Sequence, residues 1–120
     1  MRIAVPSEGV EGLMAMRSGH FGHAAYFTVM EIEDGEVKYI ETVKNADHDA
    51  VGCGGVIQHA MTLNLDAILV AGMGRPPFMR FTEAGIDVYI EQTQPTVGGA
   101  IRMFLAGECP KMGFDQACVH

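Results

Sequence analysis

Apolar residues occur along the chain in two different patterns. One pattern predicts strands, and the other predicts helices. Short runs that are apolar throughout, or rich in β-branched and aromatic residues, are typical of strands. Asp34-Gly35 lies between two of these runs and is a strong hairpin signal. Pro6 is expected to close the first run. The predicted strands are residues 3–5, 26–33, 36–43, 67–70 and 86–90.

Helical spacing replaces the strand pattern in three segments. Apolar residues recur every three or four positions over about residues 54–63. A second, short helix is expected from Pro76-Pro77, with Phe78 and Phe81 on one face and Gly85 at its C′ position. A third helix is expected between Pro95 and Gly107. Its predicted inward residues are Val97, Ala100, Ile101, Phe104 and Leu105.

The order of these elements predicts an α/β fold. Helices that alternate with buried strands indicate parallel strands flanked by helices. We therefore expect one five-stranded mixed sheet, with three parallel strands, an antiparallel hairpin at one side and three helices on its two faces. Residues 1–120 are expected to form a single domain, in which 107–120 is a mobile tail. Residues 7–22 read as a long loop, and a loop of that length is often functional.

Composition and charge narrow the classes of function. The chain has 120 residues and a formal net charge of −7, which argues against general nucleic-acid binding. Three cysteines cannot form a paired disulfide framework. The chain has no signal-peptide pattern at its start, and no apolar run approaches the ~20 residues that span a bilayer. We expect a cytoplasmic protein that does not bind membranes.

Two histidines in the long loop are the first candidate site. His20 and His23 stand three residues apart in a loop that also contains Gly19 and Gly22, so both imidazoles can face one open space. Imidazole binds borderline transition metals and can donate a hydrogen bond to an anion. Spacing alone favours the simpler alternative, a surface loop in which His20 bonds to the backbone, because two histidines do not complete a metal site.

A second candidate site precedes the first predicted helix. Cys53 falls at the expected helix N-terminus, where the helix dipole favours the thiolate that ligates metals. His48 lies five residues upstream, and Gly52 and Gly54 would let a bulky ligand approach the backbone. A structural cysteine at a glycine-rich turn is an equal alternative. His59 lies in the middle of the predicted helix, and a structural or solvated role fits it better than ligation.

The loop after the fourth strand carries two further glycines. In open α/β sheets, ligands bind beyond the carboxyl ends of the parallel strands, where this loop lies. Gly72 and Gly74 could present backbone N–H groups to an anion at the start of the next helix. Such glycines more often form an ordinary tight turn that binds no ligand. Cys109, Cys118 and His120 do not match structural-zinc spacings.

Several segments together resemble the dinitrogenase iron-molybdenum cofactor biosynthesis family. Residues 18–27 are similar to the family's S-x-H-F-G-R-A-x-Y-F element, which is its most specific motif. The other segments agree mainly in their order. They are residues 1–6, 52–55, 66–74, 85–89 and 97–107.

The resemblance implies a ribonuclease H-like fold and non-catalytic binding of a metal-sulfur cluster or its precursor. The cluster could be of the iron-molybdenum, iron-sulfur or molybdenum-copper type, and the partners could be cluster-assembly or acceptor proteins. His20 matches the family's histidine and is implied as a cluster contact. His23 stands where the family commonly has arginine, which makes direct metal ligation by His23 more attractive.

These observations lead to one main expectation and two alternatives. We expect a cluster-binding or carrier protein in which His20, His23, His48 and Cys53 line an open site. One alternative is a protein-protein adaptor on the same scaffold that has lost cluster binding. The other is a divalent-dependent hydrolase or nuclease, which lacks the carboxylates that it would need on the first strand.

Overall fold

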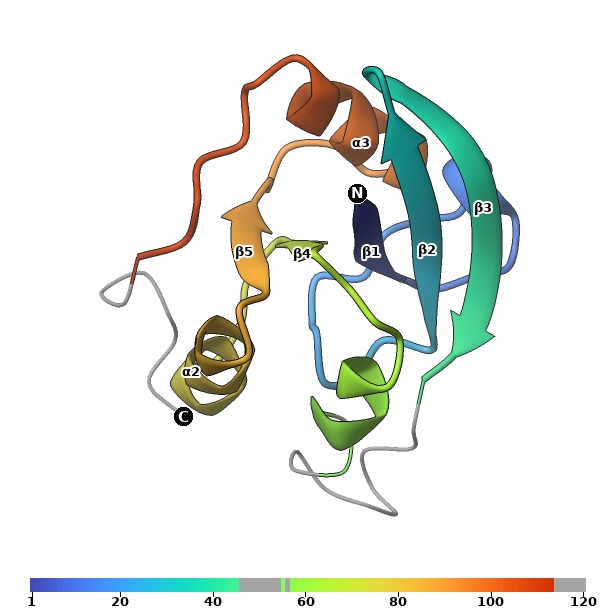
Figure 1. The fold of residues 1–120 in the computed structure, drawn as a ribbon. Coiled ribbons are helices and arrows are strands. Elements are labelled where there is room, and N and C mark those ends of the chain that lie inside the picture. Colours follow the sequence, from blue (N-terminus) through green and yellow to red (C-terminus); the bar gives the residue numbers. More distant parts are fainter. Residues whose placement is uncertain (46–54, 56, 114–120) are drawn as a thin grey trace.

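A five-stranded sheet runs through the computed structural model, which describes residues 1–45, 55 and 57–113 (Figure 1). Its strands are β1 (Arg2–Ser7), β2 (Tyr26–Glu33), β3 (Glu36–Lys44), β4 (Ala67–Val70) and β5 (Asp87–Ile90). They lie in the order β3-β2-β1-β4-β5. β1, β4 and β5 are parallel, and β2 pairs antiparallel with both β1 and β3. The predicted mixed sheet is confirmed, whereas its ribonuclease H-like label stays a prediction.

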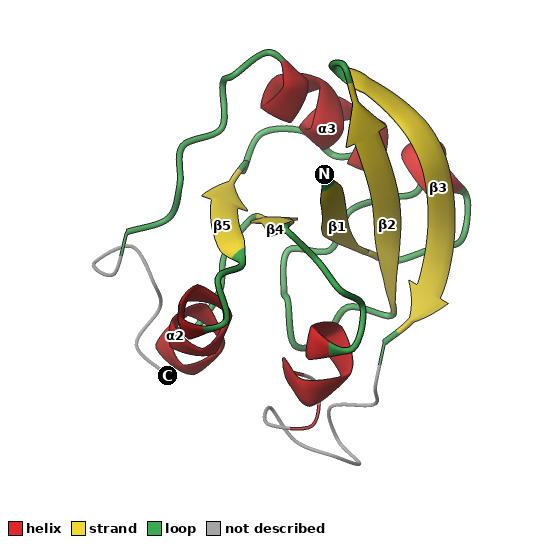
Figure 2. Ribbon diagram, in the orientation of Figure 1, coloured by secondary structure: helices red, strands yellow, loops and turns green. Residues whose placement is uncertain are grey.

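Helices cover both faces of this sheet (Figure 2). α3 (Val97–Leu105) packs on one face, near the short 3-10 helix η1 (Gly12–Met14). α2 (Arg75–Glu83) and the helical residues 57–61 pack on the other face. Among the described residues, no helix combines the length and apolarity that crossing a membrane requires.

The two central strands, β1 and β4, are apolar on both faces. In β1, Ile3 and Val5 face the α3 side and Ala4 faces the α2 side. β4 alternates in the same way, and all four of its residues are at most 1% exposed. This explains the continuous apolar runs in the sequence, because a strand covered on both faces has no solvent-facing position.

The β2–β3 hairpin forms as its sequence predicts. Asp34 and Gly35 have φ angles of 53° and 74°, which is the left-handed conformation that a two-residue hairpin turn requires. Glu33 pairs with Glu36 next to the turn. Most of β3 lies at the exposed edge of the sheet, so its side chains are largely polar or half-exposed.

Several element boundaries and one core residue differ from the sequence predictions. β1 continues through Pro6 to Ser7, since Pro6 lies beyond the part of β1 that pairs with β4 and its missing N–H breaks no bond there. α3 begins after Thr96, whose hydroxyl accepts a hydrogen bond from the Gly99 N–H at 3.0 Å. Leu105 is 38% exposed, so its predicted inward position is wrong.

Residues 108–113 lie along β5, although we expected a tail from residue 107. The Ile90 N–H donates to Pro110 O at 2.9 Å, and the Met112 N–H donates to Val88 O at 2.8 Å. Cys109 and Met112 are buried on opposite faces of the sheet. Alternating apolar side chains and backbone pairing therefore attach this stretch to the edge of β5.

Gly85 should contribute measurably to stability because it ends α2 with a φ of +80°. Gly85→Ala places a side chain in the left-handed region and should lower the free energy of unfolding by about 1 kcal/mol. Urea denaturation measures this difference. Gly19→Ala is the matched control, since a Cβ at Gly19 meets no atom within 4 Å and its φ is not positive. Equal losses in the two variants would contradict the prediction.

Candidate functional site at the carboxyl edge of the parallel strands

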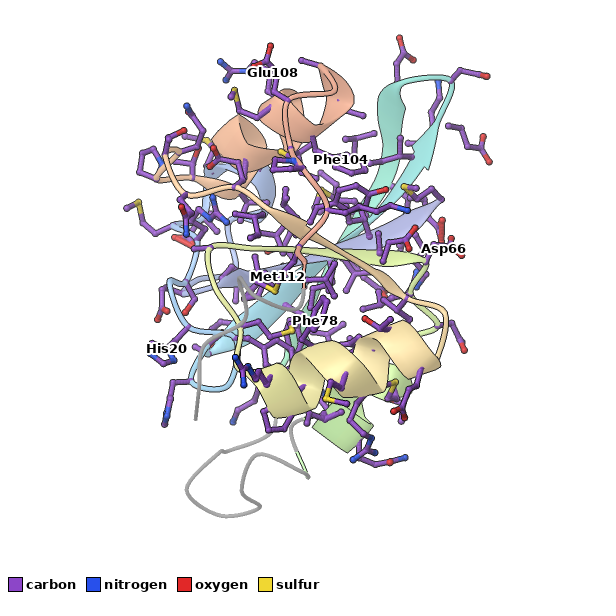
Figure 3. The ribbon with its side chains drawn as sticks, turned by 90° about the vertical axis from the view of Figure 1, so that its left-hand side faces the viewer. His20, Asp66, Phe78, Phe104, Glu108 and Met112 are labelled. Carbon is purple, nitrogen blue, oxygen red and sulfur yellow. The ribbon has the colours of Figure 1, made fainter. Side chains whose placement is uncertain are left out.

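Three loops meet at the edge where β1, β4 and β5 end. They are residues 8–25, 71–74 and 91–96. Backbone and side-chain hydrogen bonds join them: the Arg17 N–H donates to Pro95 O at 3.0 Å, and Gln92 Nε2 donates to Ala71 O at 2.9 Å. In Figure 3, His20 lies at this edge and Asp66 at the opposite one. This is the edge at which α/β sheets bind ligands.

The first loop crosses this edge from one face of the sheet to the other. Ala15 packs in the core on the α3 side, and Phe21 packs in the core on the α2 side. Phe21 is 3% exposed, and its ring lies 5.4 Å from that of Phe81 and 5.8 Å from that of Phe27. Because Phe21 points inward, it fixes the chain between the two histidines.

Ser18 provides a second anchor next to His20. Its side chain is buried, and its backbone N–H donates to Pro6 O at 2.8 Å. Its hydroxyl donates to His20 O at 3.0 Å and accepts from the His20 N–H at 3.1 Å. The backbone of His20 is therefore held by a buried hydroxyl, while its imidazole remains exposed.

His20 and His23 lie side by side on the surface. Their ring centroids are 5.5 Å apart, the ring planes are inclined by 73°, and both residues are exposed. A zinc-like ion lies roughly 2 Å from a ligating imidazole nitrogen, so two rings that share one ion have centroids about 5 Å apart. The observed spacing is close to this value, and metal ligation by the two histidines stays a prediction.

Gly72 and Gly74 lie in the second loop of the same edge. A Cβ at Gly72 would meet no atom within 4 Å, so this position borders open space. Gly74 is the N-cap of α2, but Pro76 and Pro77 have no N–H and the Phe78 N–H already donates to Gly74 O. The start of α2 therefore offers fewer free donors than the sequence interpretation assumed.

The remaining predicted site residues cannot be placed with these four. His48, Gly52, Cys53 and Gly54 lie outside the described residues, as do Cys118 and His120. Within residues 1–45, 55 and 57–113, no group of three or more His, Cys, Asp or Glu side chains is arranged to hold a metal ion. His20 and His23 by themselves do not complete a metal site.

His59 makes contacts that are typical of a structural residue. Its Nε2 lies 2.8 Å from Lys44 O, and its ring stacks on Phe27 with centroids 6.5 Å apart. These contacts agree with the structural role that its position in the helix suggested.

A buried ion pair at the same edge was not identified from the sequence. Arg17 Nη1 lies 2.7 Å from Glu91 Oε1, and the two side chains are 6% and 5% exposed. Glu91 Oε1 also accepts from the backbone N–H groups of Thr93 and Gln94, and Oε2 accepts from the Thr93 hydroxyl. The sequence feature that could have drawn attention to Glu91 was its position, since it is a carboxylate directly after a predicted buried strand.

Burial and hydrogen bonding act in opposite directions on this pair. Burial alone would raise the pKa of Glu91, but the hydrogen bonds from Gln94 and Thr93 and the charge of Arg17 outweigh it, so the pKa lies below its usual value. Burial lowers the pKa of Arg17, partly offset by Glu91. Both groups are charged at neutral pH, in a place where few other polar groups are buried.

A hollow of about 420 Å³ lies between η1 and the N-terminal half of α3. Its lining residues are Leu13, Met14, Thr96, Gly98, Gly99 and Arg102. None of the predicted site residues lines it, so the histidines occupy an open surface outside this hollow.

Comparison with known proteins assigns the chain to a family. The model of the family described as dinitrogenase iron-molybdenum cofactor matches residues 1–107. The chain belongs to this family. The match includes both histidines, the glycine turn and the Arg17–Glu91 pair. Membership of the dinitrogenase iron-molybdenum cofactor family connects the chain with the biosynthesis of that cofactor.

Individual proteins are similar to this chain over most of its length. An uncharacterized protein of Methanocaldococcus jannaschii, MJ0580, is 31% identical over 113 residues, which are 92% of this chain and 91% of the relative. The apo form of the orange protein from Desulfovibrio gigas has a TM-score of 0.81 and 29% identity, covering 93% of this chain and 92% of that chain. The crystal structure of PH0822 has a TM-score of 0.77 and 28% identity, covering 93% and 96%.

Cys109 is a poor candidate for a metal ligand in this family member. It is buried, and burial, followed by the negative charge of Glu91, raises the pKa of its thiol. A thiol that stays protonated does not ligate metals. The place of Cys109 in the core on the α3 side is typical of a structural cysteine.

The ionisation of Glu91 should make stability depend on pH. A carboxylate whose pKa is lowered by folding stabilises the protein above the unfolded value of about 4.5, and this contribution is lost as the pH falls through the folded value. At about pH 6, Glu91→Gln should lower the free energy of unfolding by about 3 kcal/mol, because it leaves Arg17 buried without a counter-charge.

The difference between wild type and Glu91→Gln should shrink as the pH falls toward about 3. Urea denaturation at several pH values measures it. Glu36→Gln is the control, since the side chain of Glu36 is 69% exposed and its ion pair with Lys38 should contribute less than about 1 kcal/mol. A difference for Glu91→Gln that stays constant with pH would refute the prediction.

Proposed function

We propose that the chain is a non-catalytic carrier that binds a metal-sulfur cluster, or a precursor of one, as cargo at His20 and His23. The single observation that carries this proposal is the pair of exposed imidazoles 5.5 Å apart, held between two buried anchors at the ligand-binding edge of the sheet. Membership in the dinitrogenase iron-molybdenum cofactor family supports this class of cargo.

The openness of the site supports carriage rather than permanent binding. Both imidazoles are exposed, and the side of Gly72 that a side chain would occupy is empty. A cargo held by a few protein ligands keeps other coordination positions open, which a closed structural site does not. Such a cargo can pass to an assembly or acceptor protein. His48 and Cys53 remain the proposed additional metal ligands, and Gly52, Gly54 and Gly74 the proposed points of close backbone approach.

The local charge also supports an anionic cargo. The chain is acidic overall, but residues 18–25 and 71–74 contain no Asp or Glu. Arg75 follows the glycine turn directly as the first residue of α2. Imidazole can donate a hydrogen bond to an anion as well as ligate a metal, so the histidines suit either a metal or a sulfide edge.

Removal of the imidazoles should abolish most of the cargo binding. The wild type is incubated anaerobically with iron, molybdate, copper and sulfide, desalted, and examined by metal analysis and visible absorption. His20→Ala and His23→Ala should each weaken retention about tenfold or more, because each removes one of few protein contacts. His59→Gln is the matched control, since His59 is a histidine that bonds to Lys44 O and is not among the predicted ligands.

Retention that is equal in the wild type and both site variants would overturn the proposal. If a partner protein is captured equally well by the apo protein and by His20→Ala, the adaptor function is favoured instead. The choice among iron-molybdenum, iron-sulfur and molybdenum-copper cargo follows from the metals that the wild type retains.

Gly72 offers a second test that leaves the histidines intact. Gly72→Val adds a branched side chain where a Cβ meets no atom within 4 Å, so the variant should fold with an unfolding midpoint close to that of the wild type. The added side chain should reduce cluster retention several-fold by occupying the space beside the turn. The same anaerobic loading measures it. Full retention in Gly72→Val would show that the cargo does not approach this turn.

A further inference from the structure

We propose that the buried Arg17–Glu91 ion pair positions the histidine loop, and that its role is the placement of His20 and His23 rather than the stability of the fold. This inference rests on the proposed function where it concerns cargo binding. It makes Arg17 and Glu91 positioning residues, which act through the loop and do not touch the cargo.

The pair differs from the other ion pairs of the described residues in its burial. Arg17 and Glu91 are 6% and 5% exposed, whereas the side chains in the other ion pairs are 23% exposed or more. Removing two charges from water is costly, and apolar residues of similar size often give equal or greater stability. A pair that persists in such a place therefore calls for a role other than stability.

Incomplete hydrogen bonding strengthens this argument. Glu91 accepts four hydrogen bonds, from Arg17, Thr93 and Gln94, so both of its oxygens are satisfied. Arg17 bonds through Nη1, and its buried Nε and Nη2 have no hydrogen-bond partner among residues 1–45, 55 and 57–113. A half-satisfied buried network does not maximise stability.

Both members of the pair are fixed to the backbone that frames the site. The Arg17 N–H donates to Pro95 O, and the next residue, Ser18, holds the backbone of His20 through its hydroxyl. The Glu91 N–H donates to Val70 O at the end of β4, one residue before the loop that contains Gly72. The ion pair therefore links the histidine loop to both other loops of the edge.

The position of the pair relative to the two cores explains why the loop needs such a link. Residues 15–21 cross the edge from the α3 side to the α2 side, with Ala15 and Phe21 packed in different cores. Apolar contacts hold the two ends of this crossing, but they are not directional. The short hydrogen bond from Arg17 Nη1 to Glu91 Oε1 is directional, and it sets the direction in which the chain leaves the core on the α3 side.

A double replacement separates placement from stability. Arg17→Met/Glu91→Leu substitutes apolar side chains of similar size, and its urea midpoint should equal or exceed that of the wild type. In metal-free protein, the wild type should give NMR cross-peaks between the rings of His20 and His23, which lie 5.5 Å apart. The double variant should lose them. Lys38→Met/Glu36→Leu, which removes an exposed pair, is the control and should keep them.

Titration with Co²⁺ alone gives a second readout. The double variant should bind Co²⁺ about tenfold more weakly than the wild type, with a changed visible spectrum, since displaced supporting residues weaken metal binding by this order. Arg17→Lys keeps the charge but replaces the planar guanidinium with a smaller and more flexible ammonium group. Arg17→Lys should shift the NMR resonances of His20 and His23 in the same direction as the double variant does, while preserving the fold. It replaces the double variant in this test if the double variant does not fold.

Each outcome bears on one proposal. Unchanged ring cross-peaks in a folded double variant or in Arg17→Lys overturn the positioning role, as does a loss of cross-peaks that only parallels a fall in the urea midpoint. If the wild type binds neither Co²⁺ nor cluster, the proposed function fails. The metal-free NMR comparison then still decides the role of the ion pair.

Discussion

The central strands β1 and β4 are buried on both faces, and this constraint determines where the protein can place its chemistry. Every side chain of β4 lies in one of the two cores, as do Ile3, Ala4 and Val5 of β1, and Arg2 is the one residue of β1 that is not buried. Polar side chains are therefore confined to the strand ends and to the hairpin. At the carboxyl edge the chain leaves three parallel strands in succession, and the resulting loops bring together residues that are far apart in sequence.

The histidine loop shows how apolar packing positions exposed groups. Phe21 fills a gap among Phe27, Phe81 and the residues around them, and its two neighbouring histidines consequently face solvent. Ser18 fixes the backbone of His20 on one side of Phe21. The buried aromatic ring and the buried hydroxyl thus set the spacing of two imidazoles that themselves contribute little to the core. The Arg17–Glu91 pair adds direction at the point where the loop enters the edge.

The acidic residues are concentrated in one part of the molecule, which the formal net charge of −7 does not show. Much of the acidic excess lies on β2, β3 and their turn, where Arg2 neutralises part of it. Arg2 donates to Glu31 at 3.3 Å and to Glu41 at 2.8 Å, and its Nε donates to Leu63 O. These contacts lie at the hairpin and the amino-terminal end of β1. At the carboxyl edge, residues 18–25 and 71–74 contain no Asp or Glu, and Arg75 follows the second of these segments.

The sequence by itself determined the elements and their order, because those depend on local periodicity. Asp34-Gly35, the apolar run of β4 and the glycine after α2 each require one conformation, so the hairpin, a buried strand and a helix end could be predicted from them. The H-F-G-H element and the two glycines of the second loop also indicated the edge at which a site would form. The pairing of residues 108–113 with β5 could not be predicted, because the sequence does not show which segment of the chain will lie beside an edge strand.

Only the tertiary structure decided which charged residues meet. Arg17 and Glu91 are 74 positions apart, and nothing in either local sequence specifies the other as its partner. Their meeting depends on three parallel strands ending at one edge and on a loop that crosses between two cores. The separation of His20 and His23 likewise follows from the inward rotation of Phe21, which packing against α2 and β2 imposes. Periodicity predicts which side chains are buried, whereas the direction of the exposed ones is set by the contacts that hold their neighbours.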